Sequence, residues 1–147
     1  MPQLTAAFCR IRCKMRRDAR EVVFKLLYAE SFVGDFSEEL FEQLATEQNL
    51  GEQDAAFAKS LLLAVKDNYD SLMTIISDLA INYLAERIYP TDKCALLIGL
   101  CEMTYFDDVP NIVAIDEALA LCKKYSTEKS LNFVNGIFAN YKSKIEK

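Results

Sequence analysis

Apolar residues recur along most of the chain at spacings of three and four, which is the period of an amphipathic helix. The first such stripe lies between about Arg16 and Ser31. Its apolar members are Ala19, Val22, Val23, Leu26 and Leu27. Because these side chains share one helix face, we expect that face to be buried.

The same period predicts three helices in the middle of the chain. A short one covers about residues 37–48, a long one runs from Glu52 to near Asp78, and another short one covers residues 82–88. The long helix carries the most sustained apolar stripe, so we expect it to be the spine of the fold. Pro90 is expected to stop the short helix, because proline disfavours helix in the residue before it.

Three further helices are predicted in the C-terminal part. The first begins at Thr91 or Asp92, either of which can cap it, and the others cover Ala114–Tyr125 and about Thr127–Ile145. Only four Gly and three Pro interrupt a chain that is 52% hydrophobic. We therefore predict an all-α protein, a compact bundle of about six or seven helices, with residues 15–147 forming a single domain.

Residues 1–14 show no clear period and hold several basic residues. We interpret them as a basic N-terminal arm, either a disordered one or an upstream extension, because Met15 directly precedes the helical pattern and could itself be a start. Basic residues follow the mildly apolar first eight, which is the wrong order for a secretory signal. No run of 18 apolar residues occurs, so we expect a cytoplasmic protein without a membrane span.

Charge is distributed unevenly along the chain. Residues 1–25 hold seven basic and two acidic residues, whereas the rest holds 10 basic and 20 acidic ones. This split suggests that one end faces a polyanion, with RNA as the first candidate. Arg16, Arg17 and Arg20 fall outside the apolar stripe and are expected to point to solvent, where guanidinium groups suit phosphate oxygens. A merely solvated arginine face is the alternative.

The residues that most enzymes and metal sites need are missing. The chain has no histidine, the commonest general base and metal ligand, and its five cysteines lack the close pairs of a zinc site. Cys94 and Cys101 are seven residues apart, which fits two small buried thiols on one helix face. We expect no catalytic residues, no metal and no cofactor.

Three blocks, in order, resemble the NusB family of bacterial transcription antitermination factors. They are residues 16–21 (RRDARE, continuing to Leu27 and Tyr28), residues 109–118 (VPNIVAIDEA) and residues 133–136 (FVNG). The resemblance covers the chain from about Met15 to its C-terminus. It implies a small all-helical protein without catalytic activity that binds the boxA element of single-stranded RNA. It also implies partnership with NusE, a ribosomal small-subunit protein, and with the transcription elongation complex in ribosomal RNA operons.

The resemblance also implies roles for individual residues. Arg16, Arg17 and Arg20 would contact phosphates, and Phe133 would meet an unstacked base. Tyr28 and Asp92 would sit on the surface that receives NusE. Phe133 in the core, and Tyr28 as half-buried packing, are the alternatives.

Several positions depart from the family pattern. Leu97 and Asn132 replace a common arginine and a common lysine, and Asp116 replaces the asparagine of an Asn-Glu pair. Lys129 lies one helical turn before Phe133 and could substitute for the lost lysine. Lys123 and Lys124, at the end of a predicted helix, could either satisfy its negative C-terminal dipole or bind RNA.

Two other functions remain open from the sequence. One is a stand-alone helical RNA-binding domain related to the N-terminal part of RNA cytosine methyltransferases, detached from its enzyme. The other is a protein-only interaction module with an incidental basic end. The sequence also leaves open whether the protein is a monomer or a homodimer.

Overall fold

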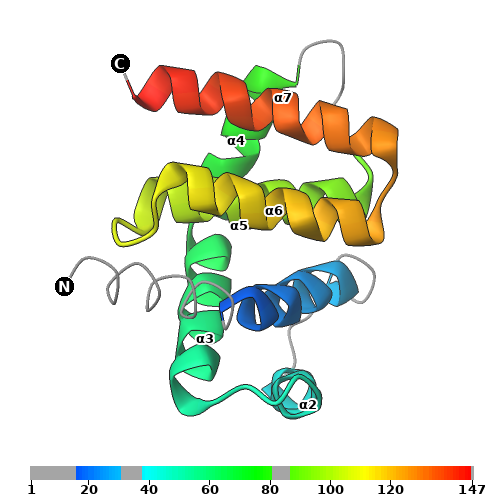
Figure 1. Ribbon diagram of the computed structural model, residues 1–147, viewed down its shortest axis with the longest axis vertical. Coiled ribbons are helices and arrows are strands. Elements are labelled where there is room, and N and C mark those ends of the chain that lie inside the picture. Colours follow the sequence, from blue (N-terminus) through cyan, green and yellow to red (C-terminus); the bar gives the residue numbers. More distant parts are fainter. Residues whose placement is uncertain (1–15, 31–37, 81–86, 147) are drawn as a thin grey trace, which may run out of the picture. The chain divides into compact units, whose positions relative to one another are not determined.

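The computed structural model describes residues 16–30, 38–80 and 87–146, which contain helices and no strand (Figure 1). The all-α prediction is confirmed. Residues 16–30 form the first helix. The helices that follow are α2 (Glu38–Glu47), α3 (Glu52–Asp67), α4 (Tyr69–Leu79), α5 (Pro90–Tyr105), α6 (Asn111–Tyr125) and α7 (Glu128–Ile145). Most of the helix predicted over 82–88, and the whole arm at 1–14, lie outside the described residues.

Contacts divide the chain into two compact units, of which the first ends at Leu62 and the second begins at Leu63. The division falls within α3. Each unit is described separately below, and the single domain over residues 15–147 stays a prediction.

In the first unit, the predicted apolar stripe of the first helix is buried, with Val22 and Val23 fully so. Two polar contacts fix the neighbouring helices. Gln48, just after α2, donates from Nε2 to Glu21 Oε2 of the first helix at 3.2 Å, and the Lys59 ammonium of α3 lies 3.4 Å from the Glu38 carboxylate of α2. The exposed ion pair adds little stability, so burial of the stripe dominates.

The turn between α2 and α3 depends on Asn49 rather than on Gly51. Asn49 has a φ of 56°, a left-handed conformation that asparagine tolerates better than most residues. The Leu50 amide then bonds back to the Ala45 carbonyl at 3.0 Å, which satisfies one of the carbonyls left open at the helix end. Gly51 has open space around it.

The prediction of one long helix from Glu52 to near Asp78 is wrong. The helix ends at Asp67 and α4 starts at Tyr69, with Asn68 between them at φ −113° and ψ 18°. The Asn68 amide Nδ2 donates to the Ala64 carbonyl at 2.8 Å. An asparagine side chain that bonds to nearby backbone competes with the helical pattern, so the apolar stripe continues although the helix does not.

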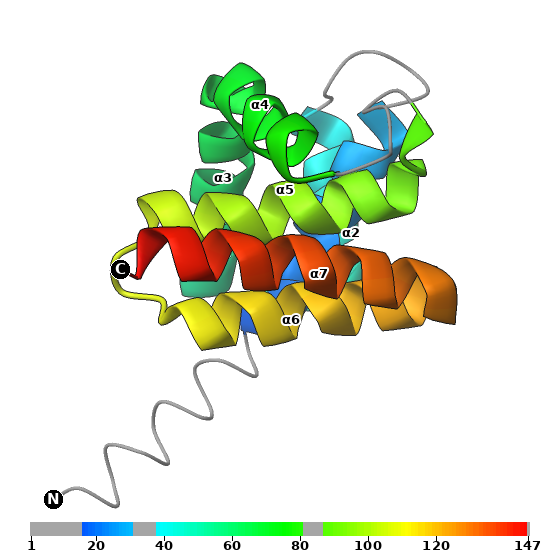
Figure 2. The same cartoon turned by 90° about the horizontal axis from the view of Figure 1, so that it is seen from above.

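In the second unit, α5, α6 and α7 run side by side, each antiparallel to the next, and α4 packs against α5 and α7 (Figures 1 and 2). Every residue from Cys94 to Met103 of α5 is buried. Because this stretch of α5 is buried on all faces and is mostly apolar, it forms the centre of this unit. None of the described helices combines the length and the apolar character needed to cross a bilayer.

The start of α5 also differs from the prediction. Pro90 is its first residue, where the missing N–H costs nothing, and Tyr89 occupies the capping position without a side-chain hydrogen bond. Neither Thr91 nor Asp92 caps the helix, because both lie within its first turn. At α7, by contrast, Thr127 is the cap, and its hydroxyl accepts from the Ser130 amide at 3.1 Å.

Close packing between α5 and α7 requires glycine at position 99. A Cβ added to Gly99 would come within 2.5 Å of Phe138 Cε1 and 3.0 Å of Ala118 Cβ. Phe138 is fully buried, and protein interiors are closely packed, so its ring could move only by displacing its neighbours.

We therefore predict that Gly99→Ala lowers the free energy of unfolding by about 1–3 kcal/mol through overpacking, despite the better helix propensity of alanine. Gly136→Ala is the matched control, because Gly136 lies in α7 with nothing within 4 Å of an added Cβ. It should raise the stability by about 0.5–1 kcal/mol. Urea denaturation of the two variants measures both values, and equal stability of Gly99→Ala and the wild type would contradict the packing argument.

Candidate nucleic-acid interface

The three arginines of the first helix differ in exposure. Arg17 is exposed, Arg16 is half-buried, and Arg20 is buried, with 1% of its surface accessible. The prediction that all three point to solvent is therefore wrong for Arg20. Arg20 borders the apolar stripe, and a long aliphatic side chain can be drawn into a core when a suitable surface covers its guanidinium group.

That surface is the ring of Phe57 in α3, within the same unit. The guanidinium carbon of Arg16 lies 4.4 Å from the ring centroid, and that of Arg20 lies 5.4 Å from it. Arg16 and Arg20 are four residues apart and hence on one helix face, so a single ring contacts both. A cation over an aromatic ring is stabilised by about 0.5–2 kcal/mol, depending on how far it is desolvated.

Phe57 is a residue of the candidate interface that the sequence did not reveal. Its spacing places it in the apolar stripe of α3, where it reads as core. No local signal pairs it with Arg16, about forty residues earlier in the chain. Only the packing of the two helices makes this contact visible.

Lys129 and Phe133 lie on α7, in the second unit. Lys129 is exposed and Phe133 is half-buried, while Val134 beside it is fully buried in the core. Residues four apart share a helix face, so Lys129 and Phe133 present a cation and part of an aromatic ring on the same side of α7. Leu97, where the family commonly has arginine, is buried in α5.

The two residues expected on a partner surface behave differently. Tyr28 is 39% exposed near the end of the first helix. Asp92 is only 3% exposed, so the expectation that it lies on the surface is wrong. The reason is its hydrogen bonding, because Asp92 Oδ1 accepts from Ser126 Oγ at 2.7 Å and from Cys122 Sγ at 3.9 Å. Asp92 thus ties the start of α5 to the end of α6.

This cluster has electrostatic consequences for its thiol. Burial, then the charge of Asp92, then the hydrogen bond to Asp92 raise the pKa of Cys122 from 9.0 to about 11. Cys101 is affected similarly, since burial and the neighbouring Glu102 charge raise its pKa to about 12. Both thiols are therefore protonated and poor nucleophiles at neutral pH.

Cys94, Cys101 and Cys122 are free and buried, as predicted for the first two. Within the described ranges, no group of three or more His, Cys, Asp or Glu residues is arranged to hold a metal ion. Lys123 and Lys124 lie in the last turn of α6, where they favour the negative end of the helix dipole. Both lysines are exposed, and Lys124 lies over the ring of Tyr125, with 5.4 Å between Nζ and the centroid.

The helical fold, with arginines at the start of its first helix, defines a class of small all-helical proteins that solved NusB structures represent. NusB of T. maritima matches with a TM-score of 0.80 and 29% identity, over 90% of this chain and 97% of that one. A structure of antitermination factors NusB and NusE in complex with dsRNA matches with a TM-score of 0.78 and 26% identity, over 88% of this chain and 98% of that one.

Sequence comparison agrees with the structural match. The model of the NusB family matches residues 17–143. The transcription antitermination protein NusB of Finegoldia magna is 34% identical over 125 residues, which are 85% of this chain and 91% of that relative. The chain belongs to the NusB family.

We predict that Asp92→Asn weakens the dependence of stability on alkaline pH. The folded pKa of Cys122 lies above its unfolded value of 9.0, so its contribution to stability is complete below pH 9 and is lost as the pH rises towards about 11. Asparagine keeps an acceptor for Ser126 but removes the charge, so the folded pKa falls and less stability is lost over this interval.

Urea denaturation at several pH values between about 8 and 11 measures the effect. Cys122→Ala is the control, because Asp92→Asn should then have no further influence on the slope. An unchanged slope for Asp92→Asn in the presence of Cys122 would contradict the proposed coupling between the carboxylate and the thiol.

Proposed function

We propose that this protein is a transcription antitermination factor that binds boxA-type single-stranded RNA together with NusE and supports read-through in ribosomal RNA operons. Membership of the NusB family carries this proposal, and the match to a structure of NusB and NusE with dsRNA supports it. The protein would act by binding, in the cytoplasm, as part of the transcription elongation complex. We propose that residues 15–147 work as one helical domain.

Arg17 and Arg16 are the proposed phosphate contacts. Arg17 is exposed and Arg16 is half-buried, so both residues keep access to solvent. Arg20 has a different proposed role, because a buried guanidinium cannot meet a phosphate unless its side chain moves. Together with Phe57, Arg20 would fix the helix face from which Arg16 extends, which reduces the entropy lost on binding.

Lys129 and Phe133 are the proposed contacts on α7. A half-buried ring is held rigidly by the core yet exposes part of its surface, which suits stacking by an unpaired base. Lys129, on the same face, would neutralise a neighbouring phosphate. This position supports the idea that Lys129 replaces the lysine that the family commonly has at Asn132.

The proposed surface for NusE includes Tyr28, whose exposed ring is a suitable anchor for a protein partner. Asp92 would act indirectly, by holding the start of α5 against the end of α6 through Ser126. The acidic composition outside the first 25 residues fits a basic ribosomal partner, because complementary charge speeds and orients docking.

A domain detached from an RNA methyltransferase is less well supported. The relative from Finegoldia magna is covered over 91% of its length, so it is a protein of about the same size as this one. A stand-alone factor accounts for that match, and no separate catalytic subunit has to be assumed.

We expect the affinity for a boxA-type oligoribonucleotide to fall as the salt concentration rises. A plot of the logarithm of the association constant against the logarithm of the salt concentration should have a slope of about −2 to −3.5, as three to five phosphate contacts require. The affinity should rise when NusE is added. Fluorescence anisotropy at several salt concentrations, with and without NusE, measures both. A flat salt dependence, or no gain with NusE, would argue against the proposal.

Arg17→Ala should weaken RNA binding about fivefold at about 0.1 M salt and reduce the salt slope by about 0.7, the effect of one phosphate contact on a single strand. The fold should be unaffected, because Arg17 is exposed. Arg87→Ala is the matched control, since it removes an exposed arginine outside the motif. Equal losses in the two variants would show that net charge alone, and not the motif, determines binding.

A further inference from the structure

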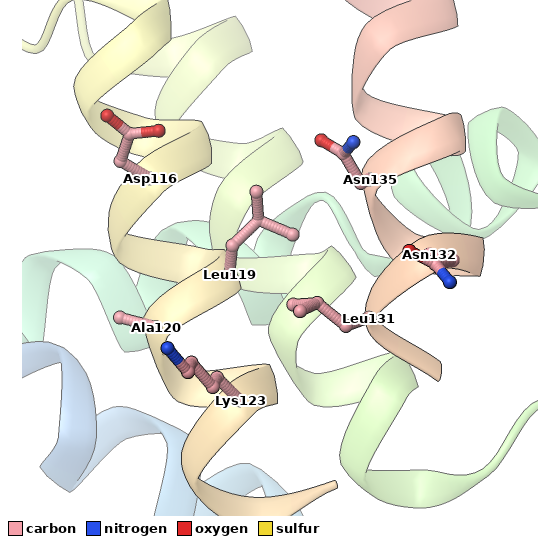
Figure 3. Close-up of a pocket in the computed structure, with 7 residues that line it drawn as sticks. All are labelled: Asp116, Leu119, Ala120, Lys123, Leu131, Asn132 and Asn135. Carbon is pink, nitrogen blue, oxygen red and sulfur yellow. The ribbon is translucent and has the colours of Figure 1, made fainter. Parts of the chain in front are cut away.

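A groove of about 390 Å³ lies between α6 and α7, in the second unit (Figure 3). Its floor is apolar, because Leu119 of α6 and Leu131 of α7 point towards one another and Ala120 also lines it. Polar side chains surround this floor. They are Asp116 and Lys123 on α6 and Asn132 and Asn135 on α7.

The two ends of the groove carry different kinds of polar side chain. Asp116 and Asn135 lie at one end, on opposite walls, and Lys123 extends from α6 at the other end (Figure 3). Asp116 and Lys123 are seven residues apart, or roughly 10 Å along the helix axis. One end therefore offers an amide and a carboxylate, and the other offers a positive charge.

We propose that this groove seats an unpaired, amino-bearing nucleobase of the bound RNA, with adenine preferred. The apolar floor would accept the flat face of the base. The Asn135 amide can both donate to and accept from the edge of adenine, and the Asp116 carboxylate can accept from an exocyclic amino group. Lys123 would bind the phosphate attached to that nucleotide. This inference rests on the RNA-binding function proposed above.

Charge also fixes the direction of the nucleotide. Asp116 repels a phosphate, while Lys123 attracts one, so the base must lie at the Asp116 end and the phosphate at the Lys123 end. A nucleobase without a donor group on its edge would leave the carboxylate unsatisfied. Uracil has one donor on its edge, the N3–H, but carbonyl oxygens on both sides of it repel the carboxylate, so uracil should bind less well than adenine.

The groove and Phe133 lie on different sides of α7. At about 100° per residue, Leu131 and Asn135 are within about 40° of one another around the helix, whereas Phe133 is about 160° away from both. Exposed Asn132 lies on the outer face between these two sides. A strand that crosses this outer face could stack one base on Phe133 and place another in the groove, so the two sites would read different bases.

The test combines a protein variant with a change in the base. Asn135→Ala removes the amide while keeping a good helix former, and Asn140→Ala is the matched control, an exposed asparagine on the same helix outside the groove. Each protein, with NusE, is titrated into short fluorescent boxA-type oligoribonucleotides. In these, each adenine in turn is replaced by purine, which lacks the amino group.

For the wild type and Asn140→Ala, purine at one position should weaken binding roughly five- to hundredfold, the discrimination typical of a well-placed bidentate contact. For Asn135→Ala, the adenine oligonucleotide should already bind more weakly, and the purine substitution should weaken binding less than in the wild type, because only the contact of the amino group with Asp116 is left to lose. Lys123→Gln should weaken binding to every sequence and reduce the salt slope, whereas Lys144→Gln, an exposed lysine elsewhere in α7, should not.

The remaining outcomes are distinct. If RNA binds but Asn135→Ala keeps the base preference of the wild type, the groove inference is wrong and the proposed function stands. If Asn135→Ala changes the oligomeric state instead, the groove is a contact between copies and the inference is also wrong. If the wild type with NusE binds no RNA, the proposed function itself fails.

Competition with adenosine monophosphate tests whether the groove binds a base within an RNA strand or a free nucleotide. Competition by the free nucleotide at micromolar concentration, lost in Asn135→Ala, would support the nucleobase site but assign it to free nucleotides. Competition only at much higher concentration, together with the coupled effect on RNA, would support a base presented by the strand.

Discussion

The second unit depends on the complete burial of α5. From Cys94 to Met103, every side chain of this helix is buried, so α5 must be covered by other helices on all of its faces. Gly99 makes this possible on the side of α7, because the absence of a Cβ allows the Phe138 ring and Ala118 to approach the backbone. Cores are packed as densely as crystals, so even one added methyl group at this position has no space. The arrangement of α6 and α7, and hence of the groove between them, follows from this contact.

In both units, a buried side chain fixes the position of a more exposed polar or charged side chain. Asp92 is removed from solvent and joins the start of α5 to the end of α6 through Ser126, while it raises the pKa of Cys122. In the first unit, the ring of Phe57 contacts the guanidinium groups of Arg16 and Arg20, of which only Arg16 keeps partial access to solvent. A fixed arginine loses less conformational entropy when it binds a phosphate, so such supports are expected beside a nucleic-acid interface.

The sequence by itself determined the helical class, the buried stripe of the first helix and most helix ends. These features depend on periodicity and on local chemistry, such as the capping hydroxyl of Thr127, and local chemistry can be read from neighbouring residues. The family could be recognised for a similar reason, because its blocks at residues 16–21, 109–118 and 133–136 are contiguous. Charge counting also located the cationic end.

Only the tertiary structure decided how exposed the individual site residues are. Periodicity placed Arg20 outside the apolar stripe, yet Phe57, about forty residues away in sequence, contacts its guanidinium group in a buried position. The sequence predicts a cap or a surface position for Asp92, whereas the structure buries it and makes Ser126, on a different segment, its hydrogen-bond donor. Asn68 interrupts the helix, although the apolar stripe continues past it. For Arg20 and Asp92 the deciding partner is distant in the sequence, and a pattern along the chain does not contain such contacts. The bond of Asn68 to Ala64 is local, but the apolar pattern does not show whether this bond or the helix wins.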